Sequence, residues 1–411
     1  MGQDEIKDES DAGNKSQGTV SSILYTVSDS VEFRSQKYAA RYTWEKAISF
    51  PLEIVFLPVE LLFKGTKTTI EIVDESKLIP RVKYLLTCDD GSCGVIPTYG
   101  SLSGGGVKIF QKGWLAPESK LDLLLSVGPK RRQTYQLRFR NNKLFGKAIS
   151  SDYFIRYKFL PDERYFFSNI KTNESNFAHE QIAGEAKFGK EFGTGYGLNA
   201  VFGLTINNIF DGRGDTKSTS KFISLGEQVK LSRLELVAQH DSKNKSGNPS
   251  EGIEVHATTG IYSQLGDDEF GFWKGSFDLK YFRHLFYDRV LMLRIAGEMT
   301  EPVGNREIPF YYLSELGRNG TIRGFERGRF RDRDMVLGSL EYRYPIWFPG
   351  IDALLFVDAG KVTKDIFNDN SENNFNISYG TGIRIWSPNG LVSKLEIGWS
   401  KDGIRIHFGL N

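Results

Sequence analysis

In the stretch WKGSFDLKYF, residues 273–282, apolar or aromatic side chains alternate with polar or charged ones along most of its length. A strand places alternate side chains on opposite faces, whereas a helix repeats about every 3.6 residues, so this period predicts a β-strand. One face of the expected strand is apolar and aromatic, and the other is polar and charged. The apolar face holds Trp273, Phe277, Leu279 and Tyr281, and the polar face holds Lys274, Ser276, Asp278 and Lys280.

The same alternation of apolar and polar residues recurs from about residue 103 to the end of the chain. RVLMLRIAGEM (289–299) and GIRIHFGLN (403–411) alternate in the same way, and turn residues separate such segments. We count about sixteen candidate strands between residues 103 and 410, an even number of the kind found in bacterial membrane barrels.

Two architectures fit alternating strands. In a soluble β-sandwich one face lies in the core and the other in water. Here the inward faces carry charges of both signs, as a water-filled lumen does, and the outward faces end in aromatic residues, as interfacial girdles do. Lipid also requires every backbone group to be paired, so the sheet must close. We therefore predict an all-β fold, a transmembrane antiparallel β-barrel of about 16 strands over residues 95–411. The outward aromatic residues are Tyr281, Tyr342, Tyr344, Trp347 and Trp399.

The composition agrees with a sheet that has one wet face. The hydrophobic share is 39%, which is low for a globular domain, while aromatic residues reach 13%. The net charge of +2 comes without a concentrated basic stripe, which argues against a nucleic-acid partner. The longest apolar run, residues 48–63, contains two prolines and two glutamates and is too short to cross a bilayer as a helix.

Two cysteines, Cys88 and Cys93, stand in the segment CDDGSC. Without further Cys or nearby His they cannot form a tetrahedral zinc site. The four residues between them allow a small disulfide ring, which would indicate an oxidising compartment. Two free thiols are the alternative.

The sequence offers no catalytic group, and we expect no enzyme activity, no cofactor and no metal. GEAKFGKE (184–191) has part of a phosphate-loop spacing, but it lacks the following Ser or Thr and has strand texture. No G-x-S-x-G motif occurs, so a fused hydrolase is unsupported. The five histidines are scattered, at positions 179, 240, 256, 284 and 407.

The C-terminal third resembles the BamA/TamA-like outer-membrane barrels, the bacterial surface antigen family. The resemblance depends on several stretches in a fixed order, and these make it specific. They are IRGF (322–325), GSLEYRYP (338–345), FVDAG (356–360), the hairpin YGTGIRIWSPNGLVSKLEIGW (379–399) and GIRIHFGL (403–410). The resemblance covers residues 95–411. Before residue 300 it lies in the alternating strand pattern more than in specific motifs.

The resemblance places the motif residues Ile322, Arg323, Gly324 and Phe325 on a loop, residues 316–333, that folds back into the barrel. Alternation puts Glu341 and Asp358 on the lumen face of neighbouring strands, where two carboxylates repel each other. A guanidinium is always charged and presents a planar fork of donors. We therefore expect Arg323 to lie between Glu341 and Asp358, with Gly324 allowing a tight backbone path and Phe325 wedged into the lumen wall. In the alternative, Arg323 is a surface residue on a mobile loop.

The N-terminal region departs from the family, whose full-length members carry periplasmic POTRA domains. We expect a disordered tail at 1–20 and a helical periplasmic extension at 21–94, with helices near 43–63 and 66–77. The extension packs against or into the barrel mouth, lies at the membrane surface, or is a degenerate POTRA domain. The opening MGQDEIKDES lacks the apolar core of a signal peptide, so we expect that a leader was removed or replaced.

The resemblance implies a protein of the outer membrane of a diderm bacterium that inserts or exports other proteins without chemistry. Its expected partners are membrane lipid, client outer-membrane or secreted proteins, and periplasmic accessory proteins. A gated or passive pore, or a specialised exporter of lipid or surface proteins, is the alternative.

We expect a weakly paired lateral seam between a first strand at 104–111 and the last strand at 403–410, since exposed strand edges readily pair with other chains. Glycines weaken a strand because they contribute no side-chain packing. The first strand contains Gly104, Gly105 and Gly106, and the polar face of the last strand carries Arg405 and His407.

Overall fold

The computed structural model describes most of the chain from residue 86 onward. The described residues are 86–88, 90–100, 104–144, 148–166, 169, 174–193, 195–211, 228–245, 247–286, 288–317, 320–346, 350–369, 375–387 and 390–410. The expected tail at 1–20 and the expected helices at 43–63 and 66–77 lie outside them.

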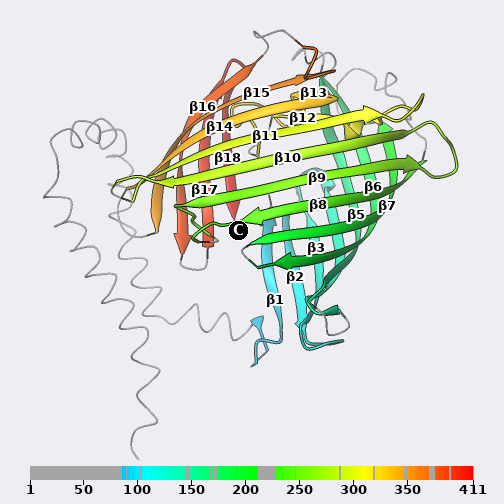
Figure 1. The fold of residues 1–411 in the computed structure, drawn as a ribbon, viewed down its shortest axis with the longest axis horizontal. Helices are drawn as coiled ribbons and strands as arrows, with labels where there is room; N and C mark the ends of the chain where they lie inside the picture. Colours follow the sequence, from blue (N-terminus) through cyan, green and yellow to red (C-terminus); the bar gives the residue numbers. More distant parts are fainter. Residues whose placement is uncertain are drawn as a thin grey trace, which may run out of the picture.

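Within the described residues, sixteen strands form one antiparallel sheet in the order of the sequence, and β12 and β13 form a separate pair. Figure 1 shows the strands curving round in this order, from β1 in blue to β18 in red. The strands are β1 Cys93–Gly100, β2 Gly104–Lys112, β3 Ser119–Val127, β4 Gln133–Asn141, β5 Ser150–Phe166, β6 Glu174–Phe192, β7 Tyr196–Asp211, β8 Gln228–Asp241, β9 Gly252–Gln264, β10 Gly271–His284, β11 Val290–Pro302, β12 Ser314–Leu316, β13 Phe330–Asp332, β14 Asp334–Pro345, β15 Ile351–Thr363, β16 Asn376–Ser387, β17 Gly390–Ser400 and β18 Gly403–Leu410. Two short 3₁₀ helices are described, η1 Pro129–Arg131 and η5 Phe310–Tyr312.

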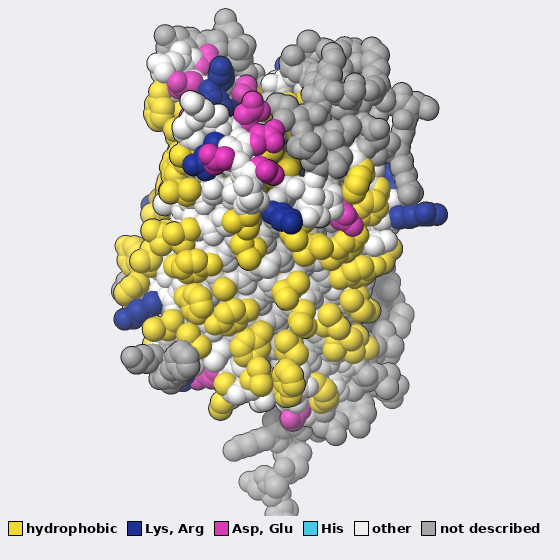
Figure 2. Space-filling view, turned by 90° about the vertical axis from the view of Figure 1, so that its right-hand side faces the viewer, with side chains coloured by type: hydrophobic (Ala, Val, Ile, Leu, Met, Phe, Trp, Pro, Cys, Tyr) yellow, Lys and Arg dark blue, Asp and Glu magenta, His cyan; other side chains and the backbone are white. Residues whose placement is uncertain are grey.

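The predicted alternation is confirmed by the two faces of the sheet. On the outer face, apolar side chains such as Ile261, Phe277 and Ile295 remain exposed. On the inner face, the polar side chains pair across neighbouring strands, as Arg294 Nη2 does with Asp278 Oδ2 at 2.7 Å. Figure 2 shows hydrophobic side chains spread over one outer face, with charged side chains gathered mainly toward one end. No described helix has the length and apolar character needed to cross a bilayer.

The two edges of the sheet are β1 and β18, which approach each other. Within the described residues no strand pairing joins them, because β1 pairs with β2 and β18 pairs with β17. Pro97 lies in β1, and a proline is tolerated there because an edge strand has N–H positions that need no ladder partner.

The expected position of the seam is corrected by the strand order. Gly104, Gly105 and Gly106 lie in β2, which is paired with β1 on one side and with β3 on the other. The short segment CGVIPTYG, with its proline and two glycines, has weak strand texture, and it is the first strand. Gly104 has a positive φ of 78°, which favours glycine. A Cβ at this position would lie 2.1 Å from the Cα of Gly128, the residue after β3, so glycine also permits this close backbone approach.

Cys88 and Cys93 are joined as a disulfide. The bridge ties the residues before β1 to its first residue, and the backbone N–H of Cys88 also donates to the carbonyl of Cys93. The ring therefore fixes the start of the edge strand.

Leu204 provides a test of the lipid-facing surface. This side chain is 58% exposed near the middle of β7. We expect Leu204→Arg to destabilise the barrel by about 2–4 kcal/mol, because a cation on the lipid face loses its hydration near the bilayer midplane. Urea unfolding in lipid vesicles measures the change. Leu204→Phe is the matched control and should unfold close to wild type, and equal stability of the Arg variant would contradict a lipid-facing position.

The disulfide can be tested by alkylation of protein purified without reductant. We expect iodoacetamide to label neither Cys88 nor Cys93 under these conditions and to label both after reduction. Mass spectrometry of the peptide that contains both residues reads the result. Complete labelling without reductant would show that the ring is open.

Candidate functional site

The connection from β11 to β14, residues 303–333, is longer than the loop expected at 316–333. Its first half contains η5, whose aromatic residues pack on the inner wall formed by β5 to β10. The Phe310 and Phe177 ring centroids lie 5.0 Å apart, and those of Tyr312 and Phe272 lie 5.2 Å apart. The run FYY was not singled out in the sequence, although three successive aromatic residues in a loop are a signal that could have been used.

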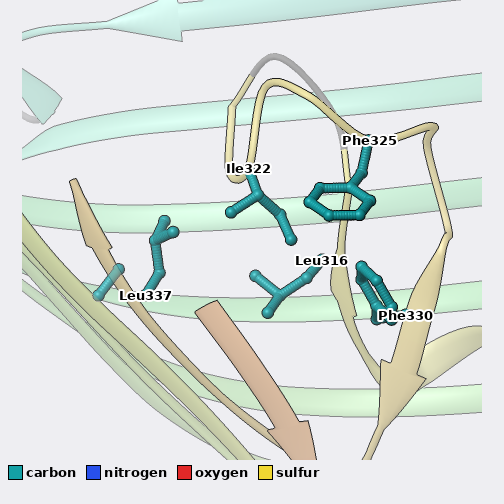
Figure 3. Close-up of a cluster of buried hydrophobic side chains, with 6 residues drawn as sticks. Leu316, Ile322, Phe325, Phe330 and Leu337 are labelled. Atoms are coloured by element: carbon teal, nitrogen blue, oxygen red, sulfur yellow. The ribbon is translucent and has the colours of Figure 1, made fainter. Parts of the chain in front are cut away.

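The second half of the loop forms a small apolar core of its own. Its members are fully or almost fully buried and come from both the loop and the barrel wall (Figure 3). Phe325 and Phe330 meet edge to face with ring centroids 5.1 Å apart. Phe325 therefore packs mainly within the loop, and the expected contact with the wall is made through two wall residues. The cluster comprises Leu316, Ile322, Phe325 and Phe330 of the loop and Ala296 and Leu337 of the wall.

Arg323 lies at the end of this core and is 5% exposed. Its guanidinium binds three carboxylates, each through at least one hydrogen bond. Two of them were expected: Nη1 donates to Glu341 Oε2 at 2.8 Å, and Nη2 donates to Asp358 Oδ1 at 2.8 Å. The third is Glu396 of β17, whose Oε1 accepts from Nη1 at 2.9 Å.

The geometry differs from a simple bridge between facing carboxylates. Asp358 pairs in register with Ser339, and Glu341 pairs with Phe356, so the two acids are diagonal neighbours. The Phe356 ring lies against the cation, with the Arg323 guanidinium carbon 3.5 Å from the ring centroid. The cation is thus held from its edges by carboxylates and from one face by an aromatic ring.

Glu396 was missed, although alternation in VSKLEIGW places it on the lumen face with Gly398. Charge repulsion alone suggested that two acids needed one cation, and nothing in the local pattern indicated a third. Its role becomes visible only when β17 is brought next to the inserted loop.

The electrostatic balance of the site favours a permanent positive charge on Arg323. Burial alone would lower its pKa, but the hydrogen bond to Asp358 and the charges of Asp358, Glu341 and Glu396 raise it above the ordinary value. Glu341 also binds Arg343, and Glu396 also binds Lys394. Among the described residues, Asp358 has Arg323 as its one cationic partner, and it is completely buried.

Gly324 is required by a close approach of the loop to the wall. A Cβ at this position would lie 2.6 Å from Ser378 Cβ and 2.7 Å from the Trp399 carbonyl oxygen, distances that real Cβ atoms do not adopt. The carbonyl of Gly324 accepts a hydrogen bond from Ser400 Oγ at 2.7 Å. The backbone of the motif therefore rests directly on β16 and β17.

The loop also holds the last strand. His407 Nε2 lies 2.6 Å from the carbonyl oxygen of Arg323, and Arg405 forms an ion pair with Glu326. Arg329 Nε donates to Asp402 Oδ2 at 2.5 Å in the turn before β18. The two residues expected on the polar face of the last strand thus both contact the loop.

The loop tip also contacts a second part of the barrel, at β5 and at Asn169, which follows β5 in the chain. Arg327 Nη1 donates to Glu163 Oε1 at 3.0 Å, and Arg164 pairs with Glu326. Arg329 Nη1 donates to the carbonyl of Asn169 at 2.6 Å. The loop therefore connects two walls of the barrel. In the described part of the chain, no group of His, Cys, Asp and Glu is arranged to hold a metal ion.

The Omp85 superfamily domain matches residues 119–411, which is more than half of the chain. The chain belongs to the Omp85 superfamily. Membership identifies it as an outer-membrane barrel of Gram-negative bacteria, in the class that inserts or exports proteins. A search of curated proteins found no match.

Two solved structures show the same fold at low sequence identity. BamA from Haemophilus ducreyi lacking POTRA domains 1–3 is 18% identical with a TM-score of 0.58, over 77% of this chain and 69% of that one. CdiB from Escherichia coli is 10% identical with a TM-score of 0.52, over 76% of this chain and 61% of that one. The chain thus spans less than two thirds of the CdiB structure.

Replacement of Arg323 by Ala should release the loop from the lumen while the strand ladder stays intact. Breaking a buried charge cluster by removal of one partner costs on the order of 3–5 kcal/mol, and less where lumen water reaches the charges. We expect faster proteolysis after the arginines at 327, 329, 331 and 333 and unchanged barrel migration in unheated SDS gels. Arg323→Lys should be released in part, because an ammonium lacks the planar fork.

A second substitution, Asp358→Asn, is combined with Arg323→Ala to test whether the two residues belong to one charge network. This change removes the carboxylate that has no other described cation, so it should restore part of the protease protection to Arg323→Ala. Wild-type protection in Arg323→Ala alone would show that the cluster does not hold the loop.

Proposed function

We propose that the barrel inserts or exports client proteins by pairing a client strand at the β1–β18 seam. The observation that supports this proposal is the unpaired state of both edges within the described residues. An unpaired strand edge presents a row of N–H and C=O groups that a further strand can complete. No bond of the client has to be made or broken, so the process requires no catalytic group.

The inserted loop supports the same proposal, because among the described residues it contacts the edge strand β18. Its contacts with β18 run from the Asp402 turn through Arg405 to His407. No contact between the loop and β1 is among those described. Movement of the loop would therefore change the position of β18 relative to β1, and the gap available to a client strand would change with it.

The orientation we propose is with the N-terminus in the periplasm. An even number of sequential antiparallel strands places the start of β1 and the end of β18 at one end of the barrel. β11 runs in the direction of β1, so the inserted loop enters from the opposite end, which is then the cell exterior. In this orientation the N-terminal region reaches periplasmic accessory proteins and arriving clients.

A gated pore is the second candidate, and one observation favours it. A polar cavity of about 270 Å³ lies inside the barrel beside Arg323, and cationic side chains dominate its lining. They are Lys243, Lys280, Arg294, Arg323, Arg343, Arg384 and Lys394, against the carboxylates Glu254, Glu341 and Glu396. If the loop moved away, this polar interior would conduct ions.

Reconstitution separates the two functions. Liposomes that contain the purified protein are mixed with a urea-unfolded second barrel, and protease-protected client is counted over time. In parallel, single-channel conductance is recorded for wild type and Arg323→Ala. We expect the wild-type protein to accelerate client insertion severalfold over empty liposomes, and Arg323→Ala to lose most of this acceleration because β18 is no longer held.

Arg138→Gln is the matched control, since the described partner of Arg138 is Asp152 of the neighbouring strand inside the barrel. It should insert the client at the wild-type rate. A wild-type protein that accelerates nothing, together with a large steady conductance in Arg323→Ala, would reject insertion and support the gated pore.

A further inference from the structure

A second cavity of about 440 Å³ lies between the loop tip, β5 and β18. Its position follows from unequal strand lengths. β1 to β4 are short, with 8 residues in β1 and 9 in each of the others, whereas β5 has 17. β4 pairs with β5 only as far as Gln133↔Phe159, so the last residues of β5 project beyond β4 at the loop end of the barrel.

The part of the barrel wall formed by β1 to β4, between β5 and β18, therefore extends less far at this end than β5 does. Asp162, Glu163 and Arg164 lie on the projecting part of β5, and Arg405 to Phe408 lie on β18. The loop tip occupies the space between these two elements and forms the inner boundary of the cavity.

The polar lining of the cavity is rich in arginine. Five arginines face four carboxylates, and the arginines are Arg132, Arg164, Arg327, Arg331 and Arg405. Several of their N–H groups have no acceptor among the described residues. These are Nε and Nη1 of Arg331, Nε of Arg327 and Nε of Arg405.

Arg331 is the most informative of these residues, because its side chain is only 7% exposed. One of its nitrogens, Nη2, donates to Glu315 Oε2 at 2.7 Å, and the other two, Nε and Nη1, are buried without an acceptor among the described residues. Buried donors without acceptors are costly, and guanidinium donors match the oxygens of phosphate especially well.

The rim of the cavity is apolar and belongs to the outer face of the barrel. Ile406 and Phe408 line the cavity and are 67% and 46% exposed. Both lie on the face of β18 that meets hydrocarbon, directly beside the arginines. Arginines next to an exposed apolar strip match a ligand that carries an anionic head and an acyl chain.

We propose that this cavity binds the anionic phosphate head group of a membrane lipid that carries a net negative charge, with its acyl chain along Ile406 and Phe408. The site is separate from the Arg323 cluster and goes beyond insertion or export of proteins. A free phosphate would use the arginines but not the apolar rim. An acidic peptide would use the arginines but would have to displace the lipid that already surrounds the barrel.

The test measures lipid retained by the protein. The full chain is reconstituted in nanodiscs that contain phosphatidylglycerol and phosphatidylcholine, released into the mass spectrometer, and the bound lipids are counted. We expect preferential retention of phosphatidylglycerol by wild type. Combined Arg331→Gln and Arg405→Gln should weaken this binding about tenfold, the size expected for loss of charge-assisted hydrogen bonds. Combined Arg138→Gln and Arg233→Gln, at ion-paired lumen positions outside this cavity, is the control and should retain the preference.

Two further measurements keep the test decisive. The wild-type preference for phosphatidylglycerol over phosphatidylcholine does not depend on any variant, and its absence would overturn the proposal. Combined Ile406→Ser and Phe408→Ser should also reduce retention. If these serine variants bind like wild type and inorganic phosphate displaces the lipid, the cavity is a site for a small anion and the lipid assignment is wrong.

Discussion

One buried guanidinium organises the lumen of this barrel. Arg323 collects Glu341, Asp358 and Glu396 from β14, β15 and β17, and the ring of Phe356 covers one of its faces. Without a cation, three carboxylates could not remain charged so close together in a site that excludes most water. Glu341 and Glu396 also pair with the wall cations Arg343 and Lys394, whereas Asp358 has Arg323 as its one cationic partner among the described residues. The inserted loop therefore completes the charge balance of these strands, and the strands fix the position of the loop.

The same loop links regions of the barrel that the strand ladder does not connect directly. Its aromatic half packs against the wall from β6 to β10, and its arginine half binds β14, β15, β17 and β18 and also β5. Aromatic packing is short-ranged and largely insensitive to salt, whereas ion pairs partly open to water are screened. The two halves therefore respond to different conditions, and release of the arginine half can leave the aromatic half in place. Such partial release would free β18 without emptying the lumen.

Much of this architecture could be predicted from local patterns. Alternation placed Glu341 and Asp358 on the lumen face, and charge repulsion between them indicated the need for a cation. The family resemblance placed Arg323 on the inserted loop and so supplied that cation. The approach failed where a contact depends on the assembled sheet. Glu396 is a third acid only because β17 lies beside the loop, and the first strand was missed because Pro97 and two glycines obscure its alternation. The glycines at 104–106 illustrate the same limit, since the sequence shows that glycine is present but not which backbone it approaches.

Glu341 extends the influence of Arg323 toward the other mouth of the barrel. Its second oxygen accepts from Arg343 Nε at 2.8 Å, and Arg343 Nη1 donates to the carbonyl of Pro249 at 3.2 Å. Pro249 lies in the connection from β8 to β9, which is at the end of the barrel opposite the inserted loop. A continuous path of hydrogen bonds thus joins the loop from one end to a turn at the other. Because both arginines share one carboxylate, loss of Arg323 would leave Arg343 as the hydrogen-bonded cation of Glu341 among the described residues and strengthen that pair. Release of the loop at one mouth would then tend to fix the turn at the other.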